Sequence, residues 1–192
     1  ASQPANKIAA AKISFAWADG DHKQIREIYH KSSLYMFLLG GFLFLNININ
    51  IHTLLQFLPS GYEQGEWVVL IISIGTLFNM ATGLNASILF NSDKYRYGAV
   101  FLISLAVLVL ILQMVLIPLK GIIGAAIATS AASLIYNTML FVSVWKFFKL
   151  QPFDQKNVKV LVVLLLCLAI GYSIPHLGNK ILDITLRSSV TS

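Results

Sequence analysis

The chain contains 192 residues, of which 57% are hydrophobic and only 11% are charged, and its formal net charge is +6. Its mean hydropathy is +0.74. Soluble globular domains carry charge on about a quarter of their residues. The composition therefore excludes an ordinary soluble domain and predicts an integral membrane protein.

Five stretches of the sequence are nearly free of Lys, Arg, Asp and Glu. Each holds an apolar run near or above the roughly 20 residues that a helix needs to cross a hydrocarbon core about 30 Å thick. The sequence therefore predicts an all-α integral membrane protein with about five transmembrane helices, at 33–58, 67–91, 97–118, 121–145 and 159–175.

The basic residues are distributed unevenly over the segments that separate the predicted spans. Eleven Lys and Arg residues fall in alternate segments on one side, and three fall on the other side. Because cytoplasmic loops are enriched in Lys and Arg, this asymmetry predicts a cytoplasmic N-terminus and cytoplasmic loops at 91–97 and 146–159. The basic balance then reflects orientation and anionic lipid headgroups, so nucleic acid is not expected as a partner.

The segment 1–31 precedes the first predicted span and is expected to be a helical connection on the cytoplasmic side, lying against the headgroups. Asp21 is expected to cap a short helix that follows it. The chain begins at Ala1, and five spans leave its two ends on opposite sides of the membrane. We therefore expect it to be a fragment of a larger protein.

The stretch "FLNININIHT" at 44–53 alternates Asn and Ile with the period of a β-strand. A lone strand in lipid would leave its backbone groups unpaired, at a cost of several kcal/mol each, so a helix is predicted instead. On a helix the polar residues form two i,i+4 pairs on different faces, Asn46 with Asn50 and Asn48 with His52. Hydrogen bonding between helices and the lining of a wet cavity are both open uses for them.

Small and polar residues recur along one side of the second predicted span. Such a face is expected to turn toward other helices or a cavity, because polar groups avoid lipid and small residues permit close packing. Asn79, near mid-membrane, is the member with the clearest functional potential. The face consists of Gly75, Asn79, Thr82, Gly83 and Ala86.

The last two predicted spans differ in character. The fourth begins with small residues at Gly124 and Ala128, so it is expected to be buried between neighbours. The fifth, "VLVVLLLCLAI", has almost no small or polar face and is expected at the lipid-facing periphery. Its Cys167 is the only cysteine of the chain, so no internal disulfide is expected.

Several kinds of chemistry are missing from the sequence. No Asp or Glu lies inside a predicted span, so there is no obvious proton relay or sodium ligand. The four histidines and Cys167 do not have the spacing of a metal site. The Gly-rich phosphate loop is missing as well. We therefore expect neither an enzyme, nor a metal, nor a cofactor.

The order of these features resembles the C-terminal half of the polysaccharide-biosynthesis transporters, including the Wzx-type flippases, of the multidrug/oligosaccharidyl-lipid/polysaccharide exporter superfamily. The resemblance covers roughly residues 1–153. Three motifs carry it: "LP-x-x-Y" before a span, "G-x-N-x-x-I-L" within one, and "G-I-x-G-A-A-I-A-T" opening another. The resembling segments are "LLQFLPSGYEQG", "GTLFNMATGLNASILFNSDKYRY", "LIPLKGIIGAAIATSAASLIYN" and "VWKFFKLQPF".

The resemblance implies a transporter of 12 to 14 helices with two lobes around a central cavity. Residues 32–153 would form a four-helix part of the C-terminal lobe, and 154–192 a peripheral transmembrane helix and tail. The implied function is to flip a lipid-linked oligosaccharide across the bacterial cytoplasmic (inner) membrane by alternating access. The implied partners are the lipid bilayer, that lipid-linked oligosaccharide and the missing N-terminal lobe of the same protein.

The candidate substrate or cavity residues are Asn79, Thr82, Asn85, Asn48 and His52. Cationic residues line the cavity in the family, but the interiors of the predicted spans here contain no Arg or Lys. Lys94 and Arg96 at the cytoplasmic mouth are therefore the nearest candidates for a first encounter with a diphosphate, and anchoring at the headgroups is the plainer use for them.

Two other functions stay open at this level. An exporter of drugs or other small molecules from the same superfamily is one alternative. The other is a non-transporting membrane scaffold or a membrane-bound glycan enzyme, for which Glu63 and Glu66 are the available carboxylate pair. Both glutamates also fit the start of a helix at Trp67, where carboxylates favour the positive end of the helix dipole.

Overall fold

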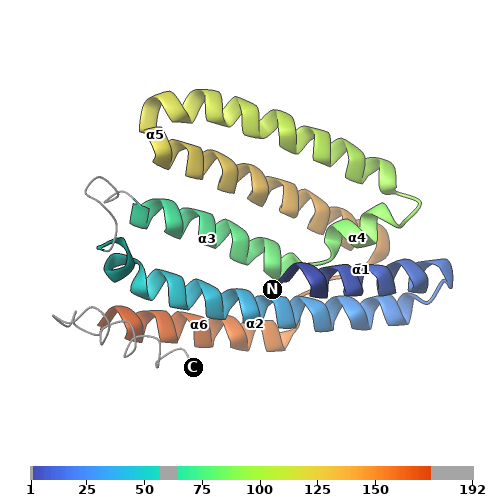
Figure 1. Cartoon of the computed structure of the whole chain (residues 1–192). Helices are drawn as coiled ribbons and strands as arrows, with labels where there is room; N and C mark the ends of the chain where they lie inside the picture. Colours follow the sequence, from blue (N-terminus) through green and yellow to red (C-terminus); the bar gives the residue numbers. More distant parts are fainter. Residues whose placement is uncertain (1, 57–64, 174–192) are drawn as a thin grey trace.

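The computed structural model describes residues 2–56 and 65–173, and this part of the chain contains helices and no strands. Figure 1 shows the helices running nearly parallel or antiparallel to one another. The prediction of an all-α protein is therefore confirmed. The helices are α1 (Ser2–Ala18), α2 (His22–Leu55), α3 (Gly65–Thr82), α4 (Asn85–Phe90), α5 (Tyr95–Phe148) and α6 (Gln155–Ser173).

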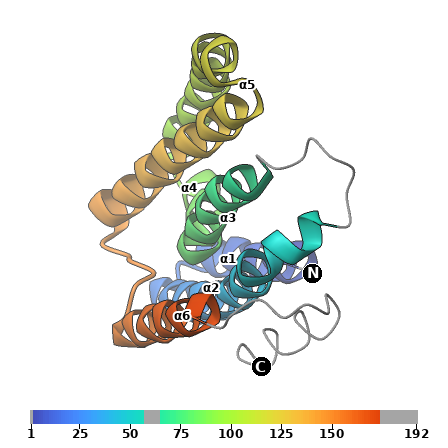
Figure 2. The same ribbon diagram turned by 90° about the vertical axis from the view of Figure 1, so that its left-hand side faces the viewer.

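The helix α3 lies at the centre of the arrangement, between α2 on one side and α5 on the other. In the end-on view of Figure 2, α6 packs on α2 at the base, away from α5. The helix α1 lies against α2 and the short α4. The helix α2 thus packs against three neighbours, α1, α3 and α6, and each of the other helices packs against one or two.

The helix α2 joins the end of the predicted connection at 1–31 to most of the first predicted span at 33–58. It begins at His22, where the Asp21 side chain accepts a hydrogen bond from the Gln24 backbone N–H at 2.9 Å, so the predicted cap is confirmed. It then continues unbroken for 34 residues, about 51 Å at 1.5 Å per residue. The helix therefore runs through residue 31 and through the whole of the strand-like stretch.

The asparagines of "FLNININIHT" are helical, as predicted, because each side-chain amide bonds to the backbone one turn earlier. Asn46 donates to the Phe42 carbonyl at 2.9 Å, Asn48 to that of Phe44 at 2.8 Å, and Asn50 to that of Asn46 at 2.9 Å. Back-bonding of this kind satisfies part of a polar side chain within its own helix. The alternating sequence therefore does not need a partner strand.

The prediction of one continuous second span at 67–91 is wrong at Gly83. The helix α3 ends at Thr82, and the short α4 starts at Asn85. Gly83 has φ +53, a left-handed conformation that glycine adopts without the steric cost of a Cβ. The five-residue face from Gly75 to Ala86 is consequently split. Thr82 is buried and Asn79 is exposed.

The helix α5 is a hairpin of two arms, which we call the first arm (95–120) and the second arm (122–148). The backbone leaves the helical region at Gly121, where φ is 56 and ψ is −132. The arms then run side by side, and the Gln113 amide lies 3.5 Å from the Thr129 hydroxyl (Figure 1). A Cβ at Gly124 would collide with the Leu116 carbonyl, so this glycine permits the close return.

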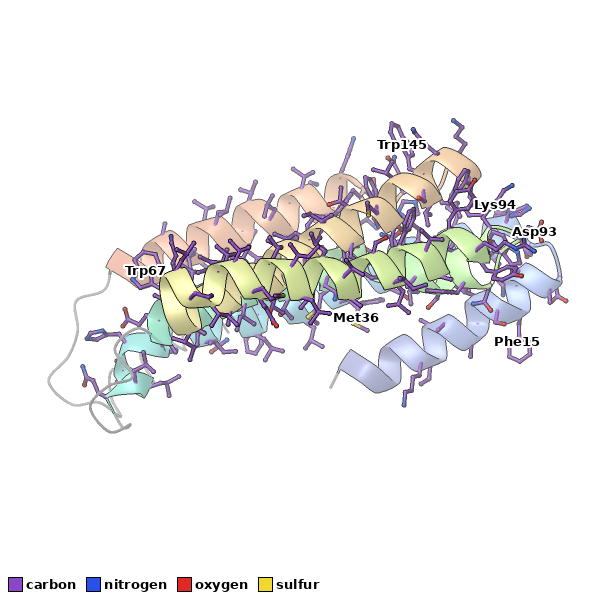
Figure 3. All side chains as sticks on the ribbon, turned by 90° about the horizontal axis from the view of Figure 1, so that it is seen from above. Phe15, Met36, Trp67, Asp93, Lys94 and Trp145 are labelled. Atoms are coloured by element: carbon purple, nitrogen blue, oxygen red, sulfur yellow. The ribbon has the colours of Figure 1, made fainter. Side chains whose placement is uncertain are left out.

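The exterior of the bundle is apolar, and polar side chains are buried inside it. Figure 3 shows side chains projecting outward along both arms of α5, and Ile103, Leu110 and Met114 are among the exposed ones. Three described helices, α2, α3 and α5, are long and apolar enough to cross a membrane. This arrangement fits a membrane-embedded protein, because lipid solvates apolar surface and polar groups turn to each other. Buried polar residues include Ser33, Asn48, Thr82, Asn85, Ser130 and Asn137.

The helix α6 packs on α2 through a glycine of α2. A Cβ added at Gly41 would lie 2.5 Å from a methyl carbon of Leu164, so the leucine fills the space above the glycine. Elsewhere on its surface α6 exposes Leu161, Val162 and Leu165. The end of the fifth predicted span, the Glu63 loop with its "LP-x-x-Y" motif and the tail at 174–192 lie outside the described residues.

Candidate functional site

The break between α3 and α4 is surrounded by buried polar side chains, which we call the polar junction (Tyr29, Ser33, Thr82 and Asn85). The first two come from α2, where they stand one turn apart on the face that also buries Ile25. The other two flank Gly83. Each is 1% exposed or less, so the junction is isolated from its surroundings.

Hydrogen bonds connect the two sides of the polar junction. The Tyr29 hydroxyl donates to the side-chain carbonyl of Asn85, and the Ser33 hydroxyl donates to the backbone carbonyl of Ala81. Thr82 donates to the carbonyls of Phe78 at 3.0 Å and Asn79 at 3.2 Å. The Asn79 carbonyl also accepts the Gly83 backbone N–H at 2.9 Å, whereas the Ala81 carbonyl, at the end of α3, is satisfied by the Ser33 side chain.

Two buried nitrogen atoms beside the junction have no hydrogen-bond partner among the described residues. They are Nδ2 of Asn85 and Nδ1 of His30, the residue next to Tyr29. An unpaired buried polar group costs about 1–3 kcal/mol. Asn85 is therefore the candidate residue with hydrogen-bonding capacity to spare, and it lies directly after a break between two helices.

A second polar contact connects the middle of α2 with α3. Asn48 donates to the Ser73 hydroxyl at 3.0 Å, in addition to its bond within α2. On the other side of α3, the Ser130 hydroxyl of α5 donates to the Ile71 carbonyl at 3.0 Å. Ser130 also faces Gly75, where an added Cβ would lie 3.2 Å away. These contacts hold α3 between its two neighbours.

His52 lies near the end of α2, opposite the first turn of α3. Its Nδ1 lies 2.7 Å from the Oε1 of Glu66 in the first turn of α3. Both side chains are partly exposed. Asn48 and His52 stand four residues apart on the α2 helix, and each has a partner on α3, Ser73 and Glu66 respectively.

The candidates at the other end of the bundle, beside the α4–α5 loop, are exposed. Lys94 precedes α5, and its ammonium lies 5.9 Å from the centre of the Phe147 ring. Figure 3 shows Lys94 and Asp93 at the end opposite Trp67. Arg96 is also exposed, as is Asn79 on α3. The structure thus groups Thr82 with Asn85, and keeps Asn48, His52, Asn79 and the two basic residues apart from them.

Four residues of these contacts were not predicted from the sequence: Tyr29, Ser33, Ser73 and Ser130. Their partners come from other helices, and for Tyr29 the partner is 56 positions away. A signal for the first two was present, since Ile25, Tyr29 and Ser33 repeat every four residues and share a helical face.

The described residues contain no group of three or more His, Cys, Asp or Glu side chains that could hold a metal ion. What the polar junction offers is hydrogen bonding by a tyrosine hydroxyl, a serine hydroxyl and an amide. When the chain is compared with protein-family models and with curated proteins, nothing matches it.

Proposed function

We propose that this chain is part of a transporter that moves a lipid-linked oligosaccharide across the bacterial cytoplasmic membrane by alternating access. The observation that carries the proposal is the interrupted helix α3–α4 with buried Asn85 directly after the interruption. Transporters form substrate sites from discontinuous membrane helices, because the break frees polar groups inside the protein. The resemblance of "G-x-N-x-x-I-L", which contains this asparagine, supports the same assignment.

The proposed topology has five spans with a cytoplasmic N-terminus. The spans are the apolar part of α2, α3 with α4, the two arms of α5, and α6. Each arm of α5 is about 39 Å long at 1.5 Å per residue, more than the hydrocarbon core of about 30 Å. The α1–α2, α4–α5 and α5–α6 connections all lie at one end, which also carries most of the basic residues (Figure 1).

The polar residues have different roles in this transporter. Asn85 and Thr82 act where α3 and α4 meet, and they bind or gate the polar part of the substrate. Asn79, on the exposed side of α3, faces the missing N-terminal lobe. Lys94 and Arg96 meet the diphosphate at the cytoplasmic side, where exposed cations attract anionic groups. Asn48 connects α2 with α3, and His52 connects their other ends.

Flipping by the complete protein in proteoliposomes tests the proposal. A fluorescent lipid-linked oligosaccharide is incorporated in both leaflets, and a membrane-impermeant quencher reports how much remains protected over time. We expect a rate well above that of protein-free vesicles. Wild-type rates in an Asn79→Ala, Asn85→Ala double variant would contradict the residue assignment, and no flipping by the wild-type protein would contradict the function.

Asn91→Ala is the matched control for Asn85→Ala. Asn91 is exposed, and its side-chain amide donates to the Ser87 carbonyl of its own segment. We expect Asn85→Ala to slow flipping at least about tenfold, equivalent to 1.4 kcal/mol in the barrier, and Asn91→Ala to leave the rate unchanged. Helix content by circular dichroism separates a transport defect from misfolding.

A further inference from the structure

A small basic pocket lies between the start of α2 and the end of α5, apart from the polar junction. It has a volume of about 280 Å³ and is lined by His22, Lys23, Arg26, Phe148 and Leu150. This volume is close to the lower end of the range of small-ligand sites, about 300–1,000 Å³. The lining combines two permanent cations and an imidazole with two apolar side chains.

No carboxylate in the described part of the chain forms an ion pair with the cations of this pocket. Lys23 and Arg26 take no part in the ion pairs found among the described residues, which are Lys31 with Glu27 and His52 with Glu66. Asp21, two residues before Lys23, accepts the Gln24 backbone N–H, and Glu27, next to Arg26, pairs with Lys31. An arginine guanidinium and a lysine ammonium on one helix therefore face the pocket with their charge uncompensated, which favours an anion.

The apolar wall of the pocket is held by aromatic packing. The ring of Trp17 stands edge-on to His22 at 5.7 Å and to Phe148 at 5.0 Å between centroids. Leu150 is buried beneath them. This wall can accept the apolar part of a ligand next to its charged part.

The position of the pocket indicates what kind of anion reaches it. It lies at the end of the bundle that carries Lys94 and the exposed Trp145 (Figure 3). Exposed tryptophan and tyrosine at the ends of membrane helices mark the headgroup level, and basic residues gather there on the cytoplasmic side. The anionic groups available at that level are lipid phosphates.

We propose that this pocket binds the phosphate group of a membrane lipid, with Arg26 and Lys23 contacting the phosphate oxygens and Phe148 and Leu150 contacting the adjoining apolar part. The lipid can be an anionic phospholipid of the bilayer or an isoprenoid diphosphate, which share this chemistry. The site does not depend on transport, since it contains none of the residues assigned to the substrate path.

Trp17 fluorescence of the full chain in detergent micelles reports on the pocket in a Trp67→Phe, Trp145→Phe background. The probes are short-chain phosphatidylglycerol, a polyprenyl diphosphate, phosphatidylcholine and inorganic phosphate. We expect a saturable change with the first two, and at least about tenfold weaker binding of the last two. Tighter binding of phosphatidylglycerol identifies a bilayer lipid as the natural ligand, and tighter binding of the diphosphate identifies an isoprenoid lipid.

Variants of the pocket and of its surroundings decide between a site and a diffuse basic surface. We expect Arg26→Gln and Lys23→Gln to weaken binding at least about tenfold, a change of 1.4 kcal/mol. Lys31→Gln, on the same helix and outside the pocket, serves as the matched control and changes binding less than twofold. Arg26→Lys keeps the charge but loses the bidentate geometry, so we expect an intermediate loss.

Three results would overturn the proposal: no saturable response to either lipid, equal losses in Lys31→Gln and Arg26→Gln, or inorganic phosphate binding as tightly as the lipids. Helix content by circular dichroism shows that each variant is folded. If Arg26→Gln does not fold, Lys23→Gln and Arg26→Lys provide the same comparison with Lys31→Gln.

Discussion

The hydroxyl of Tyr29, in the second turn of α2, donates a hydrogen bond to the side chain of Asn85 at the start of α4. Both residues are buried, and 56 positions separate them in the sequence. This bond connects the two sides of the polar junction and holds α4 against α2 where the chain leaves α3. It gives the helix break a fixed geometry.

Removing the Tyr29 hydroxyl should destabilise the protein. We expect Tyr29→Phe to lower the free energy of unfolding by about 1–3 kcal/mol, because the Asn85 side chain is left buried with neither of its groups paired. Tyr35→Phe is the control, since Tyr35 is 68% exposed on the same helix. Reversible unfolding in mixed micelles measures the difference. Equal stability of the two variants would show that the buried bond contributes nothing.

The packing of α6 on α2 should depend on the absence of a side chain at residue 41. We expect Gly41→Leu to displace α6 and to cost about 1–3 kcal/mol, as overpacking of a filled contact does. Leu164→Ala in the same chain should recover most of the loss, because it vacates the space that the new side chain needs. Labelling of Cys167, one turn beyond Leu164, by a lipophilic maleimide should rise in the single variant and fall back in the double. Additive effects of the two substitutions would argue against this contact.

The turn between the two arms of α5 should require glycine. At Gly121 the φ of 56 and ψ of −132 are unfavourable for any residue with a Cβ. Gly121→Ala is expected to cost about 1–3 kcal/mol although nothing lies within 4 Å of the added methyl group. The neighbouring Lys120→Ala, at an exposed helical position, should cost less than about 0.5 kcal/mol. Thermal unfolding of the purified variants compares them.

The proposed five-span topology predicts which connections share a side of the membrane. In a Cys167→Ser background, single cysteines at Asp19, Asp93 and Asp154 should react with an impermeant maleimide from the same side. A cysteine at Lys120 should react from the opposite side. Labelling of intact and of permeabilised right-side-out vesicles distinguishes the two sides. Reaction of residues 93 and 120 from one side would exclude the first arm as a span.

The contact between His52 and Glu66 should contribute little to stability. Both side chains are partly exposed, so we expect Glu66→Gln to change the free energy of unfolding by less than about 1 kcal/mol. The Glu66→Gln variant should flip the lipid-linked oligosaccharide at the wild-type rate. Turnover of a lipid-linked glycan by the wild-type protein that disappears in Glu66→Gln would favour the membrane-bound enzyme instead of the transporter.

Composition and local pattern determined a large part of this protein. Long apolar runs predicted helices, because a helix in lipid pairs its backbone N–H and C=O groups with each other. The same argument predicted a helix for the alternating Asn and Ile of α2. Asp21 as a cap also followed from sequence, since its partner, the Gln24 N–H, is three residues away. Helices and helix caps, whose hydrogen bonds join residues three or four positions apart, were thus predictable from the sequence.

Only the tertiary structure decided where helices break and which polar residues meet. The break at Gly83 was not predicted, because the apolar pattern continues through it and a lone glycine also occurs inside helices. Tyr29 and Ser33 became part of a site through Asn85 and Ala81, which the fold brings to them from about 50 positions away. Periodicity shows that a residue lies on a buried face. The packing of other helices against that face determines its partner, and hydrogen bonds between helices depend on that partner's position.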